Sequence, residues 1–132
     1  MNNVKQNNNE FKVVVLKSQT GTLETVTIPQ NKINLDLMYS LIDVNSIEHI
    51  MFNQTLAENN IHLWFDEEGK LVGKTPSLIL VDGHNPLDII VGDILFTSLD
   101  AEYDCISLSE QQIKLIYQQI QRTHFVNILS SK

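Results

Sequence analysis

The four histidines are the only side chains of this sequence that ordinarily titrate near neutral pH, so acid–base catalysis or imidazole ligation of a metal would depend on them. They are His49, His62, His84 and His124. None lies three or four residues from another, the spacing at which a helix presents two imidazoles to one metal ion. The histidine spacing therefore gives no support to metal catalysis.

One loop places carboxylates beside an imidazole. Asp82-Gly83-His84 is followed by Asp88 and Asp93, and such a group could carry out general acid–base chemistry. The same composition is typical of a solvated turn, which is the interpretation adopted here. We accordingly predict no catalytic residue, no metal ligand and no cofactor.

The same loop could instead help to bind a small molecule, together with the tryptophan at position 64. Trp64 could form one wall of a ligand pocket, with the loop at residues 82–88 as the other. Strand alternation sends Trp64 to the face opposite Leu63 and Phe65, where it could equally cover a second layer of the fold. The candidate ligand residues are Trp64, Asp82, His84 and Asp88.

The single cysteine, Cys105, cannot form an internal disulfide, and this favours a reducing, cytoplasmic compartment. Nearby carboxylates raise the pKa of a thiol rather than lower it, so we expect an inert cysteine. Glycine-rich nucleotide loops, a nucleophile elbow and paired CxxC motifs are all absent from the sequence.

The charge is acidic and segmental. Sixteen acidic residues and nine basic ones give a net charge of -7, and residues 33–69 and 75–113 contain no lysine or arginine. Nine dispersed cations argue against direct nucleic-acid binding, which requires clustered Lys and Arg. The acidic stretches could simply form a solvated surface. Alternatively, they offer an acidic face to a basic partner, for which the candidate residues are Asp100, Glu102 and Asp104.

The chain is 132 residues long and 42% hydrophobic, which fits one globular domain. Residues 1–10 are rich in asparagine and predict a disordered tail, so the domain is expected over residues 11–132. No apolar run is long enough to cross a membrane, and no signal peptide is expected. The sequence contains no signal for an oligomeric state.

Apolar and β-branched runs predict most of the strands, and residues 23–28 alternate between apolar and polar side chains. A hairpin is expected from residues 11–16 and 23–28, followed by strands over 47–52 and 61–65 with a connection at 54–60. Gly69 is expected to supply the positive φ of a turn that leads into a partner strand at Leu71-Val72. Residues 87–96 are expected to form one buried strand that bends at Gly92 and lies near the sheet centre.

Capping residues and periodic apolar residues predict the helices. Asn34 can cap a helix over 35–42, and Thr75 with Pro76 can start one turn through Leu80. Ser109 and Gln112 form a capping box for a helix to about residue 122, with a buried stripe of Ile113, Ile116, Tyr117 and Ile120. Residues 124–129 are expected to dock on the body or form a last short strand.

These elements predict an α+β fold. We expect a largely antiparallel sheet with one main C-terminal helix and one or two short helices packed on it.

Three segments in this order resemble the family known as domain of unknown function 3846. They are Asp66-Glu67-Glu68-Gly69-Lys70-Leu71, then Asp88-Ile89-Ile90-Val91-Gly92-Asp93-Ile94-Leu95, then Ser107-Leu108-Ser109-Glu110-Gln111-Gln112-Ile113. The resemblance covers roughly residues 11–120. The family is expected to open the first segment with asparagine and to carry an Asn-Arg pair near the next short helix, where this sequence has Asp66 and Pro76-Ser77.

The resemblance implies an accessory protein of bacteria, their phages or plasmids, with no activity to assign to a residue. Together with the acidic stretches it predicts a non-enzymatic accessory protein of a mobile element that binds another protein through an acidic surface. The alternative is a small-molecule-binding or sequestering protein with a pocket near Trp64 and the loop at 82–88.

Overall fold

The computed structural model describes residues 10–51, 54–82 and 85–130, and its elements alternate strands with three helices. In chain order they are β1 (Phe11–Lys17), β2 (Thr22–Ile28), α1 (Leu35–Ile42), β3 (Ile47–Ile50), α2 (Gln54–Glu58), β4 (Ile61–Asp66), β5 (Pro76–Asp82), β6 (Asn85–Val91), β7 (Ile94–Leu99), β8 (Cys105–Ile106) and α3 (Glu110–Ser130). Within the described part of the chain, no helix has the length and apolarity needed to cross a membrane.

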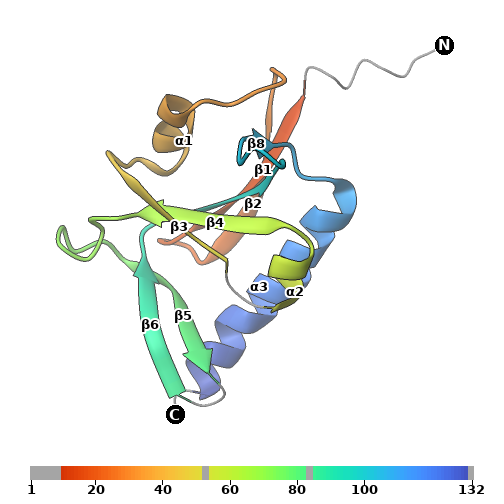
Figure 1. The fold of residues 1–132 in the computed structure, drawn as a ribbon. Coiled ribbons are helices and arrows are strands. Elements are labelled where there is room, and N and C mark those ends of the chain that lie inside the picture. The colour runs from red at the N-terminus through yellow and green to blue at the C-terminus, as the bar shows by residue number, and fades with distance from the viewer. Residues whose placement is uncertain (1–9, 52–53, 83–84, 131–132) are drawn as a thin grey trace.

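The main sheet is antiparallel throughout, with strand order β2-β1-β7-β4-β3 and β8 paired to the end of β7. A separate hairpin, β5-β6, projects from it, and α1 and α3 lie on opposite sides of the main sheet (Figure 1). This is the predicted α+β architecture, with two short helices and one main C-terminal helix.

The strands at the sheet centre are buried on both faces, which explains their continuous apolar sequences. On the α3 face, Val14 and Phe96 join a core that Ile116 and Ile120 of α3 complete. On the α1 face, residues of β1 and β7 pack against α1; the buried members are Phe11, Val13, Val15, Ile28, Met38, Ile42 and Leu95. Successive side chains along β1 and β7 thus point alternately into two separate cores.

Local capping signals determine where α1 and α3 begin. The Asn34 side chain accepts a hydrogen bond from the backbone of Leu37 at 2.9 Å. Ser109 and Gln112 form the reciprocal capping box. The Ser109 hydroxyl accepts a hydrogen bond from the Gln112 backbone at 3.1 Å, and the Gln112 side-chain carbonyl accepts one from the Ser109 backbone at 2.9 Å. In the predicted stripe of α3, Ile116 and Ile120 are fully buried, whereas Ile113 and Tyr117 are half-buried.

The segment after β4 differs from the sequence prediction. Leu71 and Val72 do not form a strand: they lie in a series of turns over residues 67–73, and Leu71 is 87% exposed. Gly73, not Gly69, has the positive φ, at 74°. Successive turns close by hydrogen bonds back to Glu68 and Gly69, so the segment forms its own loop instead of pairing with β4.

Residues 76–80, predicted as one helical turn, begin strand β5. Pairing with β6 decides this: the Ser77 hydroxyl donates to the Ile90 carbonyl at 3.0 Å, and Leu78 and Ile90 both enter the α3-side core. Pro76 is tolerated because it is the first residue of its strand.

The predicted strand at 87–96 is two strands. Gly92, with φ 81°, and Asp93 separate β6 from β7, and only β7 lies at the sheet centre as predicted. Asp93 fixes this corner because its carboxylate accepts hydrogen bonds from the Ser18 backbone at 2.9 Å and hydroxyl at 3.1 Å.

The segments at 54–60 and 124–129 also differ from the sequence predictions, and the predicted N-terminal tail lies mostly outside the described residues. The connection at 54–60 contains α2, which forms by burying Leu56 completely. Residues 124–129 do not form a strand, because α3 continues through them to Ser130. Their docking on the body stays a prediction, since their side chains are not among those described. The predicted tail lies outside the described residues except for Glu10.

Candidate functional site

The loop at residues 100–104 joins β7 to β8 and is closed around Asp100. The Asp100 carboxylate accepts hydrogen bonds from the backbones of Glu102 and Asp104, each at 2.9 Å. The Asp100 backbone donates to the Asp104 carbonyl at 2.9 Å, and Tyr103 donates to the Asp100 carbonyl at 3.0 Å. Asp100 therefore both contributes negative charge and holds the backbone of the loop in place.

Three carboxylates converge in this loop. One carboxylate oxygen from each of Asp100, Glu102 and Asp104 lies within 4.8 Å of the others, the one such group of three that the described residues contain. Among the ion pairs found between described residues, none includes these three side chains. The predicted partner surface is thus a concentrated negative charge, and its carboxylates could in principle hold a hard cation.

The same loop exposes apolar surface. Tyr103 is 79% exposed and is held with φ 67°, in the left-handed region, while Ile106 on β8 is 39% exposed. Tyrosine is among the residues enriched at the energetic centres of protein interfaces. An exposed aromatic among carboxylates is a feature that composition alone did not reveal.

Only two of the four predicted ligand residues have described side chains, Trp64 on β4 and Asp88 on β6, so their pocket stays a prediction. Trp64 is half-buried, and its ring stacks on the His49 ring with 4.5 Å between the ring centroids. Its indole N–H donates a hydrogen bond to the Thr97 hydroxyl at 2.9 Å. Asp88 is exposed on β6 and is bound to Lys70, which together with the Ile89 backbone lowers the pKa of its carboxyl. Asp82 ends β5, and His84 lies outside the described residues.

Two histidines that are thirteen residues apart meet on the α1 face. The Asn60 amide donates to the Leu99 carbonyl at 2.6 Å, so its Oδ1 faces Nε2 of His62 at 2.8 Å. Nε2 of His62 must then carry the proton, and its Nδ1 accepts one from Nε2 of His49 at 2.7 Å. Burial lowers the pKa of both imidazoles, and the charge of His49 lowers that of His62 further.

Sequence spacing could not reveal this pair, because β3 and β4 are adjacent only after the sheet forms. The available signal was strand alternation, which places His62 on the same face as Trp64. The pair belongs to a polar chain across the α1 face that continues through Trp64 and Thr97 to Cys105.

Cys105 is the half-buried end of that chain. Burial is the main cause that raises the pKa of its thiol, and Asp104 and Asp100 raise it further, while a hydrogen bond from Thr97 opposes them. The carboxylates raise the pKa of the thiol, as predicted, but burial of the thiol raises it more. A raised pKa means little thiolate at neutral pH, the form that reacts.

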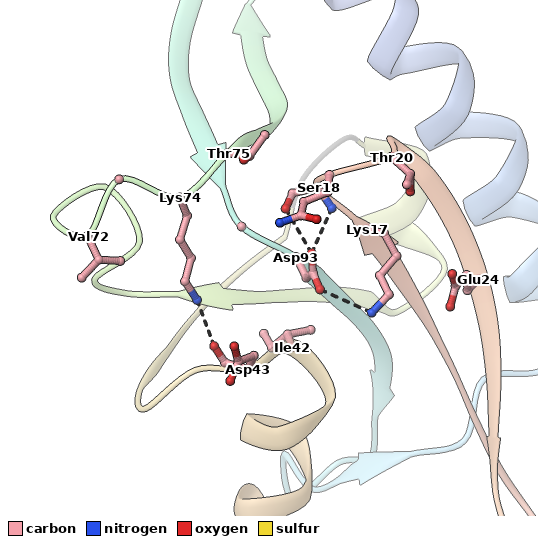
Figure 2. A pocket seen from close by; sticks show the side chains of 13 residues that line it. Lys17, Ser18, Thr20, Glu24, Ile42, Asp43, Val72, Lys74, Thr75 and Asp93 are labelled. Carbon is pink, nitrogen blue, oxygen red and sulfur yellow. Dashed lines mark hydrogen bonds and ion pairs between the residues drawn. The ribbon is translucent and has the colours of Figure 1, made fainter.

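The cavity shown in Figure 2 lies at the other end of the sheet and has a volume of about 560 Å³. Its walls come from the β1–β2 turn, the end of α1, residues 72–75 and the β6–β7 corner. The lining residues are Lys17, Ser18, Gln19, Thr20, Glu24, Ile42, Asp43, Val72, Gly73, Lys74, Thr75, Gly92 and Asp93. Trp64 and Asp88 are not among them.

Comparison with known proteins gives one match. A family model described as "Domain of unknown function (DUF3846)" matches residues 11–121. No curated protein matches, and no solved structure matches.

Proposed function

The chain belongs to the DUF3846 family, and we propose that it is a non-enzymatic accessory protein that binds a basic protein partner through the acidic loop at residues 100–104. The observation that carries the proposal is the combination, in one closed loop, of three converging carboxylates with an exposed Tyr103. The family has no described function, so the support comes from the loop itself.

The exposed Tyr103 beside the carboxylates favours a protein partner over a small ion. Converging carboxylates repel one another, and a partner's lysine or arginine side chains would relieve that repulsion and speed association. Tyr103 would contribute buried aromatic area at the centre of the contact, where most binding energy resides. Asp100 would keep both features in place, because its hydrogen bonds close the loop.

We further propose that the protein serves a mobile genetic element, a phage or plasmid, in the cytoplasm. The support for the element is the resemblance carried by the three sequence segments. The support for the compartment is the single cysteine, which cannot form an internal disulfide.

Affinity capture from a bacterial lysate tests the loop. The variant Glu102→Gln/Tyr103→Ser/Asp104→Asn removes charge and aromatic area but keeps Asp100. The control, Glu67→Gln/Glu68→Gln/Leu71→Ser, also removes two carboxylates and one exposed large apolar side chain, in another exposed segment. We expect the wild type and the control to retain a basic partner that the loop variant loses, with retention decreasing as salt rises.

Equal retention by the loop variant would overturn the proposal. So would the absence of any basic protein among those captured by the wild type.

A further inference from the structure

The cavity of Figure 2 is separate from the acidic loop and is large enough for a small organic molecule. Four segments far apart in the sequence build it, and hydrogen bonds join three of them. Asp93 accepts both the backbone and the hydroxyl hydrogen bonds of Ser18, which ties the β1–β2 turn to the β6–β7 corner. Gly92 donates to the Thr75 carbonyl at 2.7 Å, which holds the third wall.

Both lysines of the cavity already have acidic partners. Nζ of Lys17 lies 3.6 Å from the Asp93 carboxylate. Nζ of Lys74 lies 2.7 Å from the buried Asp66 carboxylate and donates to the Asp43 carbonyl at 2.9 Å. The positive charges of the cavity are therefore balanced from within the protein.

Two carboxylates of the lining are not balanced in this way. No hydrogen bond or ion pair of the Glu24 or Asp43 carboxylate is found among the described residues, and both side chains are exposed. Figure 2 shows them on opposite sides of the cavity. Asp43 also follows the C-terminus of α1, where the helix dipole adds negative potential.

The lining has little apolar surface. Of its two large apolar residues, Ile42 is 2% exposed and belongs to the α1-side core, and Val72 lies in the loop after β4, beyond Lys74 (Figure 2). A ligand that fits this arrangement carries a positive group at each end. An anion would meet two unpaired carboxylates and two lysines that are already neutralised.

We propose that this cavity binds a small aliphatic dication, with primary ammonium or guanidinium groups that pair with Glu24 and Asp43. The proposal does not depend on the acidic loop, because none of its residues lines the cavity.

Calorimetric titration of the full chain with 1,4-diaminobutane and with agmatine tests the proposal. The probes 1,4-butanediol and succinate keep the chain length but remove or reverse the charges. We expect saturable binding of one diamine or agmatine molecule per chain and no binding of the diol or the dicarboxylate. Magnesium ions at equal charge should not displace the bound probe.

Two variants with the same change in net charge locate the site. Glu24→Gln/Asp43→Asn should weaken binding at least about tenfold, because it removes two charge-assisted hydrogen bonds. Glu102→Gln/Asp104→Asn should leave it unchanged. Asparagine tolerates the left-handed backbone of residue 43, so an unchanged melting temperature is expected to show that the cavity variant folds.

Three results would overturn the assignment. They are no binding of either cation, tighter binding of succinate, and an equal loss in the two variants, which would mean that only net charge matters.

Discussion

The two faces of the main sheet are covered by helices of very different length. α3 has 21 residues and α1 has 8, which correspond to about 32 and 12 Å of helix. The α3 face is an apolar core, whereas the α1 face combines an apolar core with the chain that runs from Asn60 through two histidines and Trp64.

The difference follows from what each helix covers. β4 alternates between the faces, so it sends Leu63 to the long helix and His62 to the side of the short one. Where helical cover ends, polar side chains are acceptable if they satisfy one another, and the chain on the α1 face does this. One face therefore contributes mainly stability, and the other makes stability dependent on protonation.

The largest effect is expected from opening the α3-side core. Ile116→Ala should lower the free energy of unfolding by about 2 to 5 kcal/mol, because Ile116 is fully buried and the lost volume leaves a cavity. Urea denaturation measures the change. Gln118→Ala, on the exposed side of the same helix, should change it by less than about 0.5 kcal/mol. Equal midpoints for the two variants would mean that Ile116 adds no core stability, so the α3 face would lose the role assigned to it.

A smaller effect is expected from breaking the chain on the α1 face. His62→Leu keeps an apolar body but leaves the Asn60 carbonyl and the His49 ring without their partner, which should cost about 1 to 3 kcal/mol. The same urea experiment measures it. His49→Gln, at the exposed end, should cost less. A neutral or stabilising His62→Leu would show that the chain adds nothing to folding.

Mild acid should act on the α1 face through the two histidines. The pKa values of His49 and His62 are lowered from 6.5, so near that pH the unfolded chain binds more protons than the folded one. The free energy of unfolding should therefore be independent of these two histidines above pH 6.5 and should decrease as the pH falls below 6.5. Thermal melts between pH 7 and 5 measure this, and His49→Gln/His62→Leu should flatten the slope. An unchanged slope in that variant would assign the acid sensitivity elsewhere.

Alkali should produce the smallest change, again on the α1 face. The pKa of Cys105 is raised above 9.0, so above that pH the unfolded chain loses the thiol proton first and stability decreases as the pH rises. Melts between pH 8 and 10 with a Cys105→Ala control measure it. At pH 8, alkylation of Cys105 should be slow until denaturant is added, and rapid alkylation of the folded protein would contradict the burial described here.

The predictions that succeeded rest on signals within a few residues of each other. Asn34 caps α1 three residues ahead, and Ser109 with Gln112 caps α3, since a hydrogen bond from residue i to i+3 needs no distant partner. The hairpin of β1 and β2 was likewise predicted from an apolar run, a short turn and an alternating segment that follow one another in the sequence.

Segments whose structure depends on a distant partner were predicted wrongly or missed. Thr75-Pro76 is a good helix start locally, yet pairing with β6 and the burial of Leu78 make residues 76–80 a strand. Similarly, Gly92 and Asp93 divide a continuous apolar run because Asp93 binds Ser18, seventy-five residues away.

The candidate sites divide in the same way. The acidic loop was predicted from sequence because its three carboxylates lie within five consecutive residues, although the exposure of Tyr103 was not. The histidine pair required two neighbouring strands, and the cavity required four separate segments. Sequence by itself determined elements stabilised by hydrogen bonds within one or two turns. Tertiary structure decided every feature whose partners are brought together only by sheet pairing, because that proximity does not exist in the unfolded chain.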